Sequence, residues 1–455
     1  MTGPFHSVLL IEDKCRGCTR CIKNCPTEAI RVRQGKARIN AERCTDCGEC
    51  IRTCDNHAKT AITDSLDRLK DFKYTIALPA PALYGQFGPD VHPDRVLAAL
   101  IDMGFDDVYE VARGADVATL VTREYLRAHR EVRPMISAAC PAVVRLIQVR
   151  FPALIDHLIP VDSPMTCAGK LAKESKSREM GIPPEDIGAF FITPCPAKVT
   201  WVREASKRGF SAVDGAISIA DVYGEVFRRL AAMGEPAPRR RASGAGVGWG
   251  GSGGENAAVG LASFVVVDGI HSVIDVLEEV EMGRLADVDF IEAQACVGGC
   301  VGGALAVRNP FIAHVHLEKL AKGLAGPPAF TPEEEEDLAR RARAGQFDMR
   351  QDIAAVPAFR LDQDVSRAIS KAEMIEKVVK DLPGLDCGSC GSPHCRALAE
   401  DIVQGLAVDT DCVFKLRHQV KVLAEQLFDL ARKNPSAMSA EGKSELEAEA
   451  ERREG

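Results

Sequence analysis

The chain has 455 residues, of which 46% are hydrophobic and 27% charged, so it has the composition of a globular protein with about two to four domains. Its formal net charge of −8 excludes the strongly basic surface typical of proteins that act mainly on nucleic acid. We find no signal-peptide pattern and no apolar stretch of the ~18 to 20 residues needed to cross a bilayer, so we expect a cytoplasmic protein without membrane contact. In that compartment thiols stay reduced, and the 17 cysteines therefore indicate bound metal.

Residues 12–26 and 41–55 form an internal repeat, and each copy carries the spacing C-x2-C-x2-C-x3-C. In two-cluster ferredoxins the first three cysteines of such a run bind one 4Fe-4S cluster and the fourth binds the other. We therefore expect residues 1–66 to form an α+β ferredoxin-like module. Zinc also accepts four thiolates, but its sites pair two C-x2-C knuckles and do not favour this doubled run. The expected ligands are Cys15, Cys18, Cys21 and Cys54 for one cluster, and Cys44, Cys47, Cys50 and Cys25 for the other.

The region 67–330 has the pattern of an α/β domain. Apolar runs such as YTIALPAPA and AFFITPC alternate with helical stretches such as PDRVLAALIDMG, which predicts helices packed on a largely parallel sheet. A glycine-rich loop occupies 244–254. The five cysteines of this region lie far apart in the chain, so any site that they share must be assembled by the fold: Cys140, Cys167, Cys195, Cys296 and Cys300.

The remaining third of the chain predicts a linker, a small cysteine module and a helix. Residues 331–357 are expected to form the linker, with Thr331 as the N-cap of an acidic helix. The helical module at 358–412 resembles the single-cluster module of the Rnf electron-transport B subunit and of corrinoid iron-sulfur proteins, and a zinc knuckle is the alternative. A C-terminal helix is expected at 413–435 and a disordered tail at 436–455. The expected ligands of the module are Cys387, Cys390, Cys395 and Cys412.

Apolar residues in the expected C-terminal helix alternate in steps of three and four, which is the pattern of a heptad seam. One interpretation is that the seam pairs with a second copy in a homodimer. The other is that it packs against the core of its own chain. The seam positions are Val413, Leu416, Val420, Leu423, Leu427 and Leu430.

Three cysteine contexts in the α/β region resemble signatures of the FeFe hydrogenase family. The segments SAACPAVV, ITPCPAKV and EAQACVGGCVGG are similar to T-S-C-C-P, M-P-C-x-x-K and E-x-M-x-C-x-G-G-C-x-x-G-G, and they follow the order of that family. The resemblance implies an H-cluster, in which a 4Fe-4S cubane is joined to a two-iron subsite with carbonyl, cyanide and bridging dithiolate ligands.

Site residues follow from this resemblance. Cys300 would bridge the cubane to the two-iron subsite, and Lys198 would donate to a cyanide. A surface lysine and an ordinary flexible glycine loop are the alternatives for Lys198 and for 244–254. The implied cubane ligands are Cys140, Cys195, Cys296 and Cys300, and the implied backbone donors lie around Pro79, Ala80, Gly250, Gly251 and Ser252.

The chain departs from the family pattern where protons are delivered. Ala139 stands where the family has a proton-relaying cysteine, and alanine neither donates nor accepts a proton. Thr122 and Tyr125 occupy the positions of the acidic pair on the family's route to solvent. Thr193 and Gln294 replace two methionines and make the pocket more polar. We interpret Cys167 either as a substitute catalytic donor or as a small core residue. Such losses resemble the sensory branch of the family, here without a PAS domain.

The expected function is therefore reversible oxidation of dihydrogen and reduction of protons, at low turnover and in a sensory or regulatory role. The expected cofactors are three 4Fe-4S clusters and the H-cluster, and the expected partners are dihydrogen, protons and a redox or signalling protein. Two alternatives remain open: a non-catalytic iron-sulfur scaffold, and an electron-transfer subunit that lacks the two-iron subsite.

Overall fold

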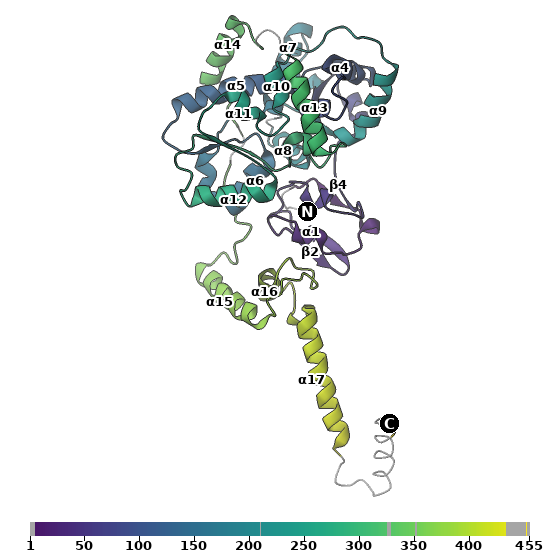
Figure 1. Cartoon of the computed structure of the whole chain (residues 1–455), viewed down its shortest axis with the longest axis vertical. Coiled ribbons are helices and arrows are strands. Elements are labelled where there is room, and N and C mark those ends of the chain that lie inside the picture. The colour runs from purple at the N-terminus through teal and green to yellow at the C-terminus, as the bar shows by residue number, and fades with distance from the viewer. Residues whose placement is uncertain (1–4, 210, 325–328, 351–352, 434–451, 453–455) are drawn as a thin grey trace. The chain divides into compact units, whose positions relative to one another are not determined.

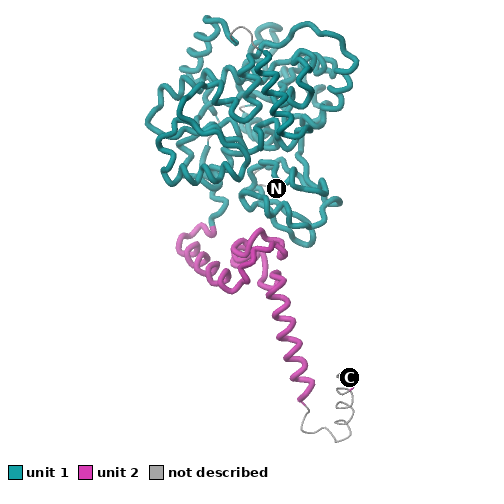
Figure 2. The backbone as a smooth tube through the Cα atoms, viewed as in Figure 1, with its two compact units in different colours: residues 1–360 teal, residues 361–455 magenta. Residues whose placement is uncertain are grey.

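A computed structural model describes residues 5–209, 211–324, 329–350, 353–433 and 452 (Figure 1). The chain divides into two compact units, residues 1–360 and residues 361–455 (Figure 2). Within the described residues, no helix is long and apolar enough to cross a membrane. The predicted disordered tail lies, apart from Arg452, outside the described residues.

The N-terminal module of unit 1 has the expected ferredoxin-like arrangement, and its internal repeat is visible in the backbone. Gly17 and Asp46 both have positive φ angles (66° and 51°), and so do Glu28 and His57 (52° and 46°). Each pair occupies equivalent positions of the two copies, so both copies fold the same way around their cysteines. Strands β1 and β4 pair antiparallel, and β2 and β3 form a hairpin. The elements are β1 (Val8–Leu10), η1 (Glu12–Lys14), α1 (Arg20–Lys23), β2 (Ile30–Arg33), β3 (Lys36–Ile39), α2 (Glu49–Arg52) and β4 (Lys59–Ala61).

The rest of unit 1 is an α/β domain with two parallel sheets, where the alternating pattern predicted one. The strand orders are β6-β5-β8-β9 and β10-β11-β7, and every pair is parallel. The fold class predicted from the sequence is confirmed. The strands are β5 (Tyr74–Pro79), β6 (Asp107–Val108), β7 (Met135–Ile136), β8 (Ile187–Thr193), β9 (Gly215–Ser218), β10 (Phe264–Asp268) and β11 (Phe290–Gln294).

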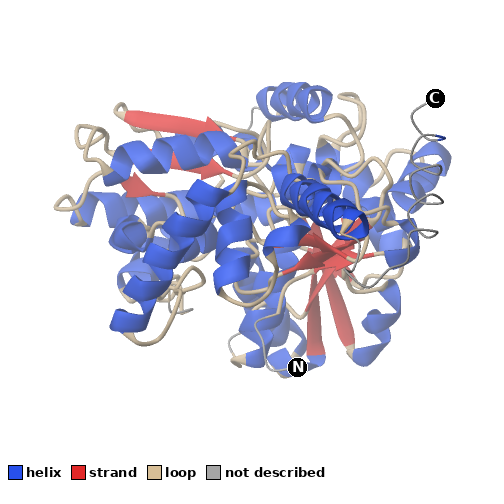
Figure 3. Ribbon diagram, turned by 90° about the horizontal axis from the view of Figure 1, so that it is seen from below, coloured by secondary structure: helices blue, strands red, loops and turns tan. Residues whose placement is uncertain are grey.

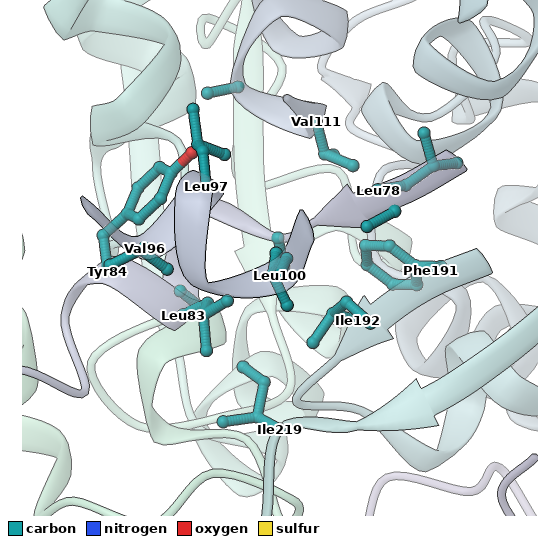
Figure 4. Packing of buried hydrophobic residues seen from close by; sticks show 14 of the residues in the cluster. Leu78, Leu83, Tyr84, Val96, Leu97, Leu100, Val111, Phe191, Ile192 and Ile219 are labelled. Atoms are coloured by element: carbon teal, nitrogen blue, oxygen red, sulfur yellow. The ribbon is translucent and has the colours of Figure 1, made fainter. Parts of the chain in front are cut away.

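Helices border both sheets (Figure 3) and form the main hydrophobic core with them. Leu78 on β5 and Phe191 and Ile192 on β8 pack with Leu100 on α4, and all four side chains are buried (Figure 4). The helices are α3 (Pro81–Tyr84), α4 (Pro93–Asp102), α5 (Val111–Ala128), α6 (Pro141–Arg150), α7 (Pro164–Met180), α8 (Pro196–Lys207), α9 (Ile219–Ala232), α10 (Gly244–Gly248), α11 (Gly254–Val259), α12 (Ile270–Glu281) and α13 (Pro310–Gly323), with 3-10 turns η2 (Leu66–Asp71), η3 (Pro152–His157), η4 (Pro184–Asp186) and η5 (Cys300–Gly302).

The ferredoxin-like module docks against α8, the helix that follows Cys195. Ser7 Oγ donates to the carbonyl of Pro196 at 2.8 Å, and Thr200 Oγ1 donates to Asp46 Oδ2 at 2.8 Å. Gly48 is essential for this approach: its φ is +78°, and a Cβ there would lie 2.4 Å from Ala304 Cβ. The module is therefore held close to the loops that carry the dispersed cysteines.

The segment 331–357, which we predicted as a linker, packs onto the large domain. Helix α14 (Pro332–Arg343) begins at the expected N-cap, Thr331, with a complete capping box through Glu334. Leu338 and Phe347 are buried in the same core as α5. The burial of these apolar side chains holds the segment against the domain. The acidic run at the start of the segment made it look solvent-exposed in the sequence.

Unit 2 contains the small cysteine module and the C-terminal helix. Its core includes Ile375, Leu398, Ala399 and Cys412. None of the residues of α17 is buried, so no described residue of this unit covers the predicted seam. The helix ends at Arg432, three residues before the predicted end. The elements are α15 (Val365–Asp381), α16 (Cys395–Val403), η6 (Asp409–Asp411) and α17 (Val413–Arg432).

Candidate metal centres and active site

Four of the dispersed cysteines meet where strands of the two sheets end. Cys195 follows β8 of one sheet, while Cys140 follows β7 and Cys296 follows β11 of the other; Cys300 begins η5. Ligands of α/β proteins commonly bind at the carboxyl ends of parallel strands. Cys140 and Cys195 are also N-caps of α6 and α8, each with a proline at the next position. The fold thus assembles the group that the family resemblance implied.

Burial favours the neutral form of these thiols as long as no metal is bound. Burial raises the pKa of Cys296 to about 11, with the thiol of Cys140 adding to the rise and Arg52 opposing it. Burial also raises the pKa values of Cys140 and Cys195. Because only thiolates bind metal well, a cation or cluster must be bound to keep them ionised. The donor set of four thiolates fits an iron-sulfur cubane.

Lys198 projects into this group from the first turn of α8. Burial alone would lower the pKa of Lys198, but the surrounding thiols, Cys300 foremost, raise it above its ordinary value. Its Nζ lies 5.7 Å from the centre of the Phe191 ring. Among the ion pairs of the described residues, none involves Lys198. The sequence alternative of a surface lysine is wrong, because the side chain carries a largely buried charge next to the four cysteines.

The glycine-rich loop is packed against the loop that carries Cys300. Val301 N donates to Gly250 O at 3.0 Å, and Ser252 N donates to Gly298 O at 3.2 Å. A Cβ at Gly299, whose φ is +87°, would lie 2.5 Å from Ser252 N. The two loops therefore touch backbone to backbone, and the alternative of an ordinary flexible connection is wrong for this part of the loop.

The backbone amides predicted as cofactor donors already have acceptors within the protein. Ala80 N donates to Ile192 O, and Ser252 N to Gly298 O. Gly250 N and Gly251 N donate to the carbonyls of Val247 and Gly248, and Pro79 has no amide hydrogen. These residues line up beside the Cys300 loop, but the structure gives no support to their role as amide donors.

The cysteines of the N-terminal module form the two crossed groups that the repeat predicted. Cys21 interacts electrostatically with Cys15, Cys18 and Cys54. Cys25 shares one small cavity with Cys44, Cys47 and Cys50. The crossing cysteines are held alike: Ala29 N donates to Cys25 Sγ at 3.2 Å, and Ala58 N donates to Cys54 Sγ at 3.3 Å. Their roles as ligands remain predictions.

The predicted ligands of the C-terminal module also gather. Cys390, Cys395 and Cys412 belong to one small core. Burial is the main cause of the raised pKa of Cys390, and the nearby thiol of Cys387 raises this pKa further. Cys395 N donates to Asp386 Oδ1 at 2.7 Å. Cys412 is the N-cap of α17, so this group and the helix are covalently continuous.

Cys167 lies in the core of α7 and is fully buried. Its thiol donates to the carbonyl of Asp162 at 3.6 Å, and burial followed by the charge of Asp162 raises its pKa well above the ordinary value. The contacts described for Cys167 do not include the cysteines around Lys198. The location agrees with a core residue, and its role as a substitute donor remains a prediction.

Sequence reasoning missed a buried acidic pair next to Ala139. Ser137 Oγ lies 2.8 and 2.7 Å from the two carboxylate oxygens of Glu255, and Ala139 N donates to Ser137 Oγ at 3.2 Å. Glu292 accepts hydrogen bonds from Gly253 N and Asn256 N, both at 2.8 Å. The signals available in the sequence were the glutamate in WGGSGGENAA and the glutamate within the apolar strand FIEAQ.

The two carboxyl groups have different surroundings. Burial raises the pKa of Glu255 well above its ordinary value, and the charge of Glu292 raises it further. Burial also raises the pKa of Glu292, but amide donors at the start of α11 favour its ionised form. We therefore assign the shared proton to Glu255. The Gln294 side chain donates to Glu292 Oε1 at 3.1 Å and touches the backbone next to Cys300.

Comparisons with known proteins agree with this site. The family model described as "Iron only hydrogenase large subunit, C-terminal domain" matches residues 73–263 and 252–304, and models of a 4Fe-4S dicluster domain and an Fe-S cluster match residues 7–55 and 382–414. These matches support iron-sulfur cofactors in all three parts of the chain.

Curated relatives include hydrogenases of two bacteria. The periplasmic Fe hydrogenase large subunit of Nitratidesulfovibrio vulgaris is 33% identical over 214 residues, which is 43% of this chain and 51% of that protein. Iron hydrogenase 1 of Clostridium pasteurianum is 24% identical over 386 residues, 69% of this chain and 67% of that protein. The chain thus spans between half and two thirds of their lengths. A structure of the FeFe hydrogenase HydA1 from Chlamydomonas reinhardtii aligns with 17% identity and a TM-score of 0.47 over 63% of this chain and 95% of that one.

The family model covers the region between the two iron-sulfur modules, and this region contains the four-cysteine group, Lys198 and the loops packed beside them. The chain belongs to the iron-only, or FeFe, hydrogenase family.

Proposed function

We propose that this protein catalyses the reversible oxidation of dihydrogen to protons and electrons at an H-cluster. The observation that carries the proposal is Lys198, a largely buried ammonium that faces four cysteines, forms no ion pair among the described residues, and interacts with the carboxyl group of Glu255 only through its charge. A buried charge without a partner is costly. An anionic group next to the cysteines would supply that partner, and cyanide ligands have this charge.

Different residues would bind different parts of such a cofactor. Cys140, Cys195, Cys296 and Cys300 would hold the cubane, with Cys300 also bound to the two-iron subsite, and Lys198 would bind a cyanide. When bound, the two-iron subsite supplies the metal at which dihydrogen is split or formed. The protein contributes a site between two sheets from which bulk water is largely excluded, and this strengthens the contact of Lys198 with its anion.

Proton supply is assigned to Glu255 and Glu292. Ala139 cannot relay a proton, but Ala139, Ser137 and Glu255 line one small cavity together with Asp162. Glu255 holds a proton near neutral pH, and Ser137 can pass it on because a hydroxyl both donates and accepts. Gln294, in place of a family methionine, connects Glu292 with the Cys300 loop. Cys167 stays a second candidate donor.

Electrons would travel through three 4Fe-4S clusters, two in the N-terminal module and one in unit 2. The losses at Ala139, Thr122 and Tyr125 favour a slow enzyme with a sensory or regulatory role in the cytoplasm, working with a redox or signalling protein. The 4Fe-4S ligand groups predict about sixteen iron atoms per chain in cubes and two in the subsite.

Infrared spectroscopy after reconstitution with the two-iron cofactor tests the proposal. Bands of metal-bound carbonyl and cyanide, with hydrogen evolution from a reduced dye by the purified chain, are the expected result. Their absence in protein that retains all its iron-sulfur clusters would favour the scaffold alternative. Bands without turnover by the isolated chain would favour an electron-transfer subunit.

For the partner of α17 we propose a second copy of this chain. All six seam residues are exposed, from 42% at Val413 to 67% at Leu427. Valine at two of the three a positions and leucine at all three d positions favour a parallel two-stranded coil. Of the flanking e and g positions within the helix, 419, 424, 426 and 431 are glutamine or alanine and 417 is arginine. In a parallel pair position 417 faces Cys412 of the other helix, so no like charges oppose pairing. Because Cys412 caps the helix, redox change at the terminal cluster would act directly on it.

Sedimentation of the full chain at micromolar concentration tests this pairing. Wild type is expected to sediment as a dimer and Leu423→Lys as a monomer, because a lysine at the seam would bury an unpaired charge. Asp429→Lys, which changes a residue off the seam, is the matched control and should remain dimeric. A monomeric wild type would refute the dimer without affecting the hydrogenase proposal.

A further inference from the structure

Lys59 is a buried lysine without a hydrogen-bond partner. It lies on β4, paired with Leu10 of β1, and its relative exposure is 5%. Its Nζ is buried, and no acceptor for it exists among the described residues. Burying an ammonium group without a partner costs several kcal/mol, so the charge requires a partner that the protein atoms alone do not provide.

The neighbours of Lys59 are cysteines of both groups in the N-terminal module. Cys21 and Cys50 belong to one buried core. Burial raises the pKa of each thiol, and the charge of Lys59 is the strongest effect opposing that rise in both. Cys21 belongs to the first expected cluster and Cys50 to the second. The ammonium group is therefore close to a cysteine of each expected cluster.

Arg52 contacts cysteines of the next two groups and, unlike Lys59, has hydrogen-bond partners in the protein. It is the last residue of α2, and its Nη1 donates to Cys296 Sγ at 3.5 Å. Its Nη2 donates to the carbonyl of Cys47 at 3.4 Å and pairs with Glu49 Oε2 at 2.7 Å. Cys47 belongs to the second expected cluster, whereas Cys296 belongs to the group around Lys198. Two cations thus separate three successive cysteine groups.

We propose that Lys59 and Arg52 are positioning residues that raise the reduction potentials of the clusters next to them. A nearby positive charge favours the more negative, reduced form of a cluster, and charge and hydrogen bonds to sulfur are known levers on cluster potential. Both act through the clusters and touch no substrate. This inference rests on the cluster assignment in the proposed function.

Redox titration of the reconstituted full chain, followed by electron paramagnetic resonance, tests the role of Lys59. Lys59→Met should make the reduction of both N-terminal clusters about tenfold less favourable, a shift of about 59 mV to more negative potential for a one-electron couple. Lys59→Arg, which keeps the positive charge, should have potentials close to those of the wild type. Lys70→Met, at an exposed lysine paired with Asp67, is the control for loss of charge and should shift neither.

Arg52→Gln should shift the second cluster and the active-site cubane by a similar factor but leave the first cluster unchanged. Glutamine removes the charge and the ion pair with Glu49 and keeps one amide nitrogen as a donor. Iron analysis distinguishes a failure of the proposed role of the two cations from a failure of the cluster assignment. Variants with full iron content and unchanged potentials would overturn the role of these cations, whereas a wild type without iron at these cysteines would overturn the cluster assignment itself.

Discussion

Replacing Glu255 with glutamine should slow hydrogen turnover while the clusters stay in place. Glutamine preserves the size of the side chain and can still hydrogen-bond to Ser137, but it has no ionisable proton. Ser137 Oγ contacts both carboxylate oxygens of Glu255, at 2.8 and 2.7 Å, and accepts from Ala139 N at 3.2 Å. The substitution therefore removes proton exchange two hydrogen bonds away from Ala139, where the relay of the family begins.

The size of the effect follows from the environment of the carboxyl group. One positioned acid–base group contributes typically 10²- to 10⁴-fold to rate, which corresponds to about 3 to 5 kcal/mol of activation free energy. Burial, reinforced by Glu292, raises the pKa of Glu255, so the group carries its proton at neutral pH and loses it as pH rises through the folded value. Proton reduction by wild type should fall over that range, and the glutamine variant should lack this step.

The same raised pKa predicts the direction of a stability effect. A carboxyl with a higher pKa in the folded state contributes stability that is fully present below its unfolded pKa and is lost as pH rises through the folded pKa. The loss amounts to at most about 1.4 kcal/mol per pH unit. The thermal midpoint of wild type should therefore decline with rising pH above about 4.5, the ordinary glutamate value, more steeply than that of Glu255→Gln.

The assay is hydrogen evolution from a reduced dye across pH, with infrared spectroscopy to confirm equal loading of the two-iron cofactor. The protonated carboxyl of wild type should also give a carbonyl stretching band that is lost in the variant. Glu318→Gln, at an exposed glutamate paired with Lys322, is the matched control. An unchanged rate and pH profile in fully loaded Glu255→Gln would refute the assignment of the proton to this carboxyl.

Four further substitutions probe the site. Cys300→Ala should abolish turnover and leave the paramagnetic signals of the N-terminal clusters, and surviving turnover would disprove the bridging role. Ala139→Cys should raise the rate of turnover only if the first proton transfer limits it. Cys167→Ala should lower the rate and alter its pH profile if the Cys167 thiol donates the proton. An unchanged rate and pH profile in Cys167→Ala would show that Cys167 is a core residue. Gly302→Ala would place a Cβ 2.1 Å from Val297 O, so we expect a loss of about 1 to 3 kcal/mol in stability, seen as a lower thermal midpoint, and a midpoint equal to wild type would contradict the close packing of this loop.

Local spacing in the sequence was sufficient to predict the modules and most of the cysteine groups. Ligands two or three residues apart must lie near one another whatever the rest of the chain does, and a repeated run of four cysteines restricts the arrangement further. This is why the crossed partners Cys25 and Cys54 were predicted correctly as neighbours of the opposite runs. The capping residue Thr331 was predicted for the same reason, because a helix N-cap depends on its own next three residues.

The dispersed group depended on resemblance, since nothing local relates Cys140 to Cys296. Only the two parallel sheets bring their strand ends together. The Glu255–Glu292 pair, the burial of Lys59 and the contact of Arg52 with Cys296 were invisible for the same reason: a glutamate, lysine or arginine is usually exposed, and its burial depends on partners far away in the chain. The burial of Leu338 and Phe347 within the predicted linker at 331–357 was not expected, because it depends on contacts with the core around α5. The sequence alone therefore determined which residues could bind metal, and the tertiary structure decided which charged side chains lie next to the cysteine groups.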